Sequence, residues 1–167
     1  MQNLSSDLPK RADLFDTLNQ AGRELSTATV LFHSALAEQF GLNATDWKCG
    51  DLLMRMGPLT AGQLAELTGL TTGAITGVVD RLEKAGFVRR EKDPHDRRKV
   101  IIQPLYEEAE RQTASFLDAY AQVWAELYSS YSDQDLALIL DFITRSVKVT
   151  QEETLKLRQK TGKHKRG

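Results

Sequence analysis

The spacing of apolar residues is helical along most of this 167-residue chain, but it changes to that of two short strands between Phe87 and Gln103. Phe87–Arg90 and Val100–Gln103 predict a β-hairpin, and Pro94 between two aspartates suits the turn that joins the strands. One strand pair inside an otherwise helical chain cannot form a core of its own. It must pack on the helices next to it.

Two short helices are expected immediately before this hairpin. A capping box, Thr60–Gln63, opens the first, and Gly69 ends it. Thr71 or Thr72 caps the second, which runs to Gly86. Two short helices joined by a tight turn and followed by a hairpin predict a winged helix-turn-helix.

Long helices are expected on both sides of this block. Apolar residues recur from Pro9 to Phe40 with only Gly22 interrupting, a helix of roughly 45 Å, which is longer than this chain's own core and therefore expected to lie across a partner. Two more helices follow Pro104. We expect a mainly α fold with a small β-hairpin wing, divided into an N-terminal dimerisation helix (1–41), a winged helix-turn-helix DNA-binding lobe (42–104), and C-terminal dimerisation helices with a basic tail (105–167).

Composition fits a folded, water-soluble protein, with 41% hydrophobic and 27% charged residues. No apolar run is long enough to span a membrane, and the N-terminus lacks the order of a secretory signal. The single cysteine, Cys49, cannot form an internal disulfide. We expect a cytoplasmic protein with no membrane partner.

Charge is distributed unevenly, although the net charge is only -1. Residues 71–103 hold eight Lys/Arg against five Asp/Glu, and residues 156–167 hold six Lys/Arg and no acid. The rest of the chain is strongly acidic. A phosphate backbone responds to the local basic patch, so duplex DNA is the expected partner.

The second short helix is the expected reader of the DNA major groove. Its exposed face is predicted to contact DNA through Thr71, Thr72, Gly73, Thr76, Gly77, Arg81 and Lys84. Two glycines weaken a helix, so Gly73 and Gly77 need a reason: a close approach to DNA, which we favour, or tight packing on another helix.

The hairpin tip supplies the second expected DNA contact. Arg97 or Arg98 can enter a narrow minor groove, Lys99 can reach a phosphate, and Asp93 and Asp96 are expected to support the turn and aim an arginine. The alternative is a solvated, charge-balanced turn. A position directly after a helix-turn-helix favours the wing.

The run from Leu70 to Ile102 resembles the recognition helix and wing of the MarR (multiple antibiotic resistance regulator) family. The resemblance rests on Asp80-Arg-Leu-Glu, Gly86-Phe-Val, Asp93-Pro and Asp96-Arg-Arg. It implies a homodimeric transcription regulator, expected to be a repressor on a pseudo-palindromic operator, released by a small aromatic or amphipathic molecule. Where many members have Leu-Thr-x-x-Gly after the wing, this chain has Leu105-Tyr-Glu-Glu-Ala109.

The resemblance also implies an effector crevice between the first helices and the DNA-binding lobe. His33, Trp47 and Asp51 are the candidates to line it, although a core anchor is the more common role for such a tryptophan. Cys49 fits a passive buried thiol better than a redox switch. We expect no metal and no cofactor, because the three histidines lack ligand spacing and no phosphate loop is present.

Two other functions compete with a DNA-binding regulator. A winged-helix module for protein interaction or dimerisation would bind no DNA, and the basic wing argues against it. A methyltransferase with a winged-helix dimerisation lobe would need a nucleotide-binding sheet, and residues 105–167 are too few and helical. We therefore expect a protein that is not an enzyme.

Overall fold

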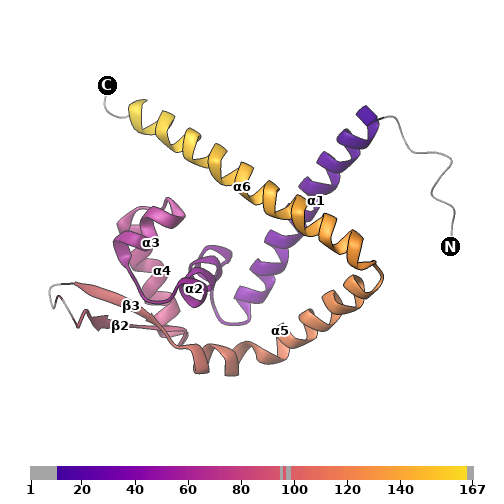
Figure 1. Cartoon of the computed structure of the whole chain (residues 1–167). Helices are drawn as coiled ribbons and strands as arrows, with labels where there is room; N and C mark the ends of the chain where they lie inside the picture. Colours follow the sequence, from indigo (N-terminus) through magenta and orange to yellow (C-terminus); the bar gives the residue numbers. More distant parts are fainter. Residues whose placement is uncertain (1–10, 95, 97–98, 165–167) are drawn as a thin grey trace. The chain divides into compact units, whose positions relative to one another are not determined.

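The computed structural model describes residues 11–94, 96 and 99–164. The chain forms two compact units, Met1–Gln112 and Thr113–Gly167. The elements are α1 (Arg11–Glu38), α2 (Ala44–Met56), β1 (Leu59–Thr60), α3 (Ala61–Thr68), α4 (Thr72–Lys84), β2 (Val88–Lys92), β3 (Val100–Pro104), α5 (Tyr106–Ser129) and α6 (Asp133–His164), all but β1 labelled in Figure 1. The predicted mainly α fold with a small β wing is confirmed. The three-segment division by role stays a prediction.

Local capping fixes the three short helices of the first unit. Asn43 and Asp46 form a reciprocal capping box at the start of α2, and Thr60 and Gln63 form another at the start of α3. Gly69 ends α3 in the left-handed conformation, at φ 75°, which costs glycine nothing. The chain can therefore turn at once into α4.

The inner face of α4 closes the core of this unit. Its four apolar side chains are almost completely buried among those of α2, α3 and the sheet: Ile75, Val78, Val79 and Leu82. This is the face that helical spacing predicts. Because the inner face is fixed by packing, the opposite face of α4 must point to solvent.

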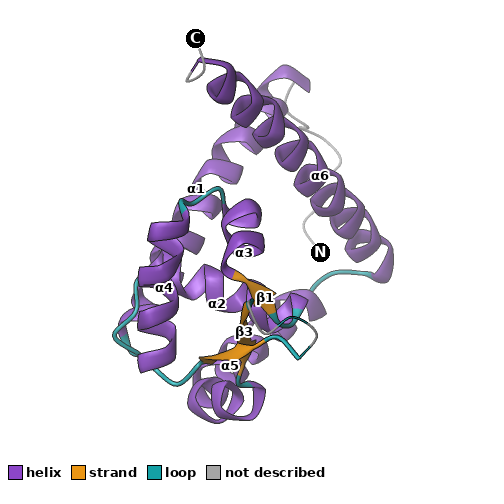
Figure 2. Ribbon diagram, turned by 90° about the vertical axis from the view of Figure 1, so that its left-hand side faces the viewer, coloured by secondary structure: helices purple, strands orange, loops and turns teal. Residues whose placement is uncertain are grey.

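The sheet has three antiparallel strands in the order β1-β3-β2. The predicted hairpin is present, with Arg90 opposite Ile102, and β3 also pairs with the two residues of β1, so that Leu59 lies opposite Ile102. Figure 2 shows β1 and β3 side by side next to the start of α3. The sequence did not predict β1, because two residues carry no periodic signal.

Aromatic rings join the end of α1 to the rest of the first unit. The ring of Phe40 stacks on Trp47 at 5.8 Å between centroids, and Phe87 meets both rings edge-on. The backbone N–H of Leu42 donates to the carbonyl of Ala37. The α1–α2 turn is therefore held by ring packing and by hydrogen bonds.

The second unit contains most of α5 and all of α6. The hydroxyl of Ser132 accepts from the N–H of Asp135 at 3.2 Å and caps α6. Large apolar side chains along both helices are exposed in the single chain, among them Phe116, Leu117, Val123, Leu127, Leu138, Phe142, Ile143 and Val147. They recur at helical spacing along the two helices.

No helix among the described residues is long and apolar enough to cross a membrane.

Candidate nucleic-acid interface

The outer face of α4 carries small polar groups at its start and cations at its end. Thr71, Thr72, Gly73 and Thr76 are exposed, and Lys84 is exposed in the last turn. The Thr71 hydroxyl accepts from the N–H of Ala74, so it caps the helix as expected. This gives α4 a narrow N-terminal end with N–H groups directed outward, which suits close contact with a phosphate or a base edge.

The two glycines of α4 have different surroundings. A Cβ added at Gly73 would meet nothing within 4 Å. A Cβ added at Gly77 would lie 3.4 Å from Nη1 of Arg81, so the space beside Gly77 is filled by that guanidinium. The neighbour of Gly77 is thus a side chain of α4 itself, and not another helix as one of the two explanations from the sequence expected. A close approach of DNA at Gly73 stays a prediction.

Arg81 lies on the interface helix but binds inside the protein. Its Nε donates to Oδ2 of Asp46 at 2.8 Å and its Nη2 donates to Oδ1 at 2.7 Å. Asp46 is completely buried, whereas the Arg81 side chain is 46% exposed. The hydrogen bond to Asp46 raises the pKa of Arg81 above its ordinary value. The predicted contact of Arg81 with DNA stays a prediction, and the structure adds an internal partner that the sequence did not indicate.

A second arginine joins the wing to α4. On β2, Arg90 donates from Nη2 to Asp80 at 2.6 Å and from Nη1 to Glu83 at 2.5 Å. The Arg90 backbone N–H also donates to Glu83 at 2.8 Å. By contrast, the neighbouring Arg89 pairs with Glu91 on its own strand and remains 59% exposed. Arg90 therefore fixes the base of the wing on the helix.

The wing tip is built around two aspartates and a lysine. The N–H of Asp93 donates to the carbonyl of Lys99, and Oδ1 of Asp93 accepts from the N–H of Asp96 at 3.2 Å. Nζ of Lys99 lies 3.8 Å from Asp96, and its side chain is 62% exposed. Arg97 and Arg98 lie outside the described residues, so their predicted groove contacts stay predictions.

The three candidate effector residues lie near the α1–α2 junction. Trp47 is half-buried, and its ring packs against Phe40 and Phe87. Burial, and then the charge of Lys48, lower the pKa of His33, while Asp51 acts in the opposite direction. Asp51 also pairs with Arg55 at 3.1 Å. Trp47 therefore anchors the core, and the effector role of the three residues stays a prediction.

Cys49 is buried on α2. Burial, and then the nearby charge of Asp46, raise the pKa of its thiol to about 11. A thiol with this pKa is protonated near neutral pH and is a poor nucleophile. The surroundings of Cys49 are those of a passive core residue.

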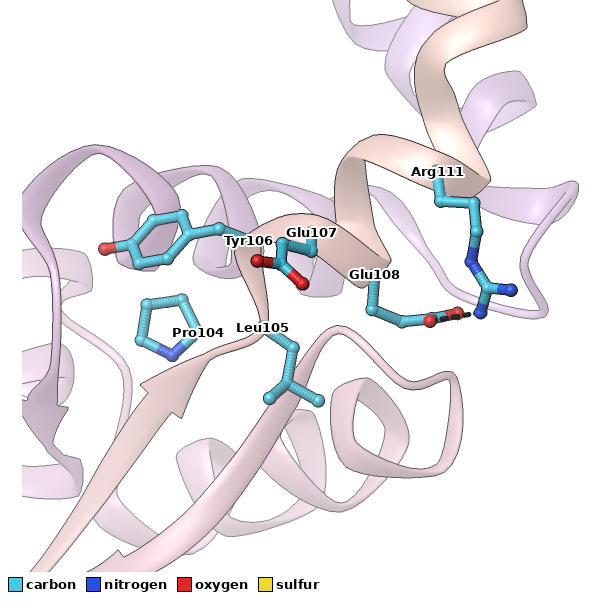
Figure 3. Close-up of a pocket in the computed structure, with 6 residues that line it drawn as sticks. All are labelled: Pro104, Leu105, Tyr106, Glu107, Glu108 and Arg111. Atoms are coloured by element: carbon cyan, nitrogen blue, oxygen red, sulfur yellow. Dashed lines mark hydrogen bonds and ion pairs between the residues drawn. The ribbon is translucent and has the colours of Figure 1, made fainter.

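The chain that joins the wing to α5 lines an open pocket of about 560 Å³ (Figure 3). Figure 3 shows the carboxylate of Glu108 directed at the guanidinium of Arg111. Glu108 also accepts from Gln112, whose amide reaches the carbonyl of Ala85. The hydrogen bonds from Gln112 and Arg111 lower the pKa of Glu108, and the one from Gln112 has the larger effect. Glu108 and Arg111 thus bind each other, and Gln112 connects the start of α5 to the turn after α4.

Among the described residues, no three His, Cys, Asp or Glu side chains are grouped so as to hold a metal ion.

Two capped helices joined at Gly69, with a hairpin fixed on the second one, define the class: a winged helix-turn-helix protein with a DNA-binding lobe. A sequence model of the MarR family matches residues 42–100. The HTH-type transcriptional regulator YcgE of Bacillus subtilis, named as uncharacterized, is 43% identical over 149 residues, which is 89% of this chain and 96% of that protein. The chain belongs to the MarR family of transcription regulators.

Other similar proteins agree with this assignment. The homoprotocatechuate degradative operon repressor of Escherichia coli is 25% identical over 78% of this chain and 90% of its own length. Among solved structures, a MarR protein from Peptoclostridium difficile has a TM-score of 0.63 at 17% identity, covering 93% of this chain and 99% of that one. A MarR transcriptional regulator from Methanosarcina mazei has a TM-score of 0.59 at 20% identity, over 85% and 99%. These structures share the fold.

Proposed function

We propose that this protein is a homodimeric repressor that binds a pseudo-palindromic operator, with α4 in the major groove and the wing in the minor groove. The observation that carries the proposal is the outer face of α4, which is narrow and exposed at its start, with a basic wing fixed beside it by Arg90. A dimer would place two such faces about one helical turn of DNA apart. The Escherichia coli relative named as an operon repressor supports the direction of regulation.

The exposed apolar helix faces support dimerisation. On α1, Phe15, Leu18 and Leu25 are at least half exposed, and the apolar residues of α5 and α6 named above are 41–69% exposed. So many exposed large apolar side chains are unusual on a monomer. A second copy of the chain would cover them with the same surface, as in any two-fold interface.

The DNA-binding test is a fluorescence-anisotropy titration on DNA from upstream of the protein's own gene, repeated across a range of salt concentrations. We expect affinity to fall steeply with salt, and Arg97→Ala to weaken binding and reduce the slope of log K against log salt by about 0.9, the value for one phosphate contact. Arg55→Ala is the control, since that exposed arginine lies on α2 and pairs with Asp51. The absence of salt-dependent binding to this DNA would favour an interaction module instead.

The dimer test is sedimentation equilibrium of the full chain. Leu18→Arg places a charge on the exposed apolar face of α1 and is expected to shift the protein toward monomer and to weaken operator binding. Glu24→Arg is the control, because it changes the charge at another exposed position of the same helix that is not apolar. It should leave the protein dimeric. A wild-type chain that is monomeric at micromolar concentration would refute the dimer.

Release by a small aromatic molecule is the last part of the proposal, at the crevice near His33, Trp47 and Asp51. In a Trp124→Phe variant, Trp47 is the only tryptophan left. Benzoate, as a simple aromatic carboxylate, is expected to quench its fluorescence and to lower DNA affinity over the same concentration range. DNA release without a change in Trp47 fluorescence would place the effector elsewhere.

A further inference from the structure

The ion pair between Arg81 and Asp46 connects the helix proposed to enter the major groove, α4, with α2. Arg81 lies on α4, and Asp46 lies in the first turn of α2, 35 residues earlier. Two nitrogens of the guanidinium bind the two carboxylate oxygens, at 2.8 Å and 2.7 Å. This is the two-point geometry that orients both side chains as well as attracting them.

The Arg81 side chain passes beside Gly77, which lies one turn before it on α4. A Cβ added at Gly77 would lie 3.4 Å from Nη1 of the guanidinium, a close van der Waals contact. Nη1 is not one of the two nitrogens that bind Asp46. The glycine in the middle of α4, which costs helix stability, thus leaves room for the guanidinium.

Asp46 cannot easily give up its partner. Its carboxylate is completely buried, and apart from Arg81 its recorded hydrogen bond is from the backbone N–H of Asn43, at 3.1 Å. A buried carboxylate that loses its cation is left with an uncompensated charge, which is far more costly than the loss of a surface ion pair. A DNA phosphate that drew Arg81 away would have to meet that cost. We therefore expect Arg81 to stay on Asp46 when DNA binds.

Asp46 also connects α4 to α1. Asn43, which shares the capping box with Asp46, directly follows Leu42, whose N–H donates to the carbonyl of Ala37 at the end of α1. The line of contacts runs from α1 through the turn and Asp46 to Arg81, all within the first unit. It consists of hydrogen bonds with fixed directions.

We propose that Arg81 is a positioning residue that sets the orientation of α4 through Asp46, and not one of the side chains that contact DNA. The proposal rests on the proposed DNA-binding function and states how that function depends on the body of the protein. It separates the cations of the interface into two kinds. Arg81 holds the helix in place, whereas the exposed Lys84 on α4 and Lys99 on the wing are left to meet phosphates.

The test compares Arg81→Gln, Asp46→Asn and the double variant, with affinity for operator and for random DNA measured across salt concentrations. If Arg81 positions α4, each single variant loses about tenfold in operator affinity, the size of one good base contact, while the salt slope stays at the wild-type value. The double variant, in which two amides can still bond, is expected to lose no more than either single variant. Affinity for random DNA should hardly change.

Opposite results are expected if Arg81 contacts a phosphate. Arg81→Gln would then lower the salt slope by about 0.9 and weaken operator and random DNA alike. Asp46→Asn would release Arg81 toward DNA and tighten binding. Either result overturns the proposal. Lys84→Gln removes the same charge from the same helix. It provides the reference for how much the salt slope and the DNA affinity change when a phosphate contact is lost in this protein.

Two measurements keep the outcome interpretable. Circular dichroism selects a temperature at which every variant is folded, and Arg81→Lys, which keeps the buried charge compensated, replaces Arg81→Gln if that variant does not fold. If the role of Arg81 is only to stabilise the fold, the folded variants keep the wild-type ratio of operator affinity to random-DNA affinity. That result also overturns the proposal. If the wild-type chain binds no DNA, the proposed function itself fails; if it binds and Asp46→Asn tightens binding, only the positioning role fails.

Discussion

Gly73 offers the sharpest single-residue test of the DNA-binding face. It is the second residue of α4, it is exposed, and a Cβ there would meet nothing within 4 Å. In the isolated protein, Gly73→Ala therefore brings no clash, and the loss of glycine's conformational freedom is worth about 0.5 kcal/mol of added stability near a helix end. For a protein of this size that corresponds to a rise of ~1–2 °C in melting temperature.

On DNA the same methyl group is expected to have the opposite effect. If the start of α4 lies against a phosphate or a base edge, the methyl group holds the two backbones apart and lengthens several hydrogen bonds at once. We expect operator affinity to fall at least about tenfold, or about 1.4 kcal/mol. A variant that is more stable yet binds more weakly cannot be explained by damage to the fold.

The assay pairs thermal unfolding with anisotropy titration at one fixed protomer concentration, because dimerisation would make the melting temperature depend on concentration. Gly62→Ala is the matched control: Gly62 is the second residue of α3, is exposed, and its added Cβ would have only an ordinary contact, 3.9 Å from the Thr60 hydroxyl. It should give the same stability gain. An unchanged or improved operator affinity in Gly73→Ala would refute the close approach.

Three further results are expected. Arg90→Ala removes ion pairs that join the wing to α4 and should cost about 1–2 kcal/mol in urea unfolding, whereas Arg89→Ala should cost under about 0.5 kcal/mol; equal losses would contradict the role of Arg90. Since the pKa of Cys49 is raised from 9.0 to about 11, its stabilising contribution is complete below pH 9 and is lost as pH rises toward 11. Cys49→Ala should flatten this loss of stability at high pH. Native Cys49 should react with a thiol reagent near pH 7 more slowly than the urea-unfolded protein does, and equal rates would contradict its burial. The pKa of His33 is lowered, so the contribution of this side chain to folding stability is complete above pH 6.5 and is lost as pH falls through the lowered value. His33→Gln should therefore unfold less readily than wild type near pH 5. Identical acid unfolding curves would contradict this.

The parts of the fold that sequence predicts well are those set by local chemistry. The buried face of α4 and the cap at Thr71 follow from helical spacing and from side chains that bond within three residues. The wing hairpin follows from a change in period and a proline turn. Each of these signals is local in the sequence, so one sequence is enough to read them.

The parts that sequence missed depend on residues far apart in the chain. Asp46 has an evident local role in its capping box, and nothing near it indicates that Arg81 will bind the same carboxylate. Arg90 looks like one more wing cation until the fold brings it to Asp80 and Glu83. Gly77 cannot be separated from Gly73 by spacing, because only the path of Arg81 distinguishes the two.

The pairing of β1 with β3 has a consequence for how this lobe can change by mutation. Thr60 pairs with Ile101 of β3 across the sheet and is also the N-cap of α3. One residue therefore holds both the start of the helix-turn-helix and the second strand of the wing. An insertion between Gly57 and Ala61 would disrupt both at once. The pairing of β1 with β3 stops at Ile101, short of the wing tip. Exchanging tips between relatives should therefore transfer groove preference while leaving the lobe folded.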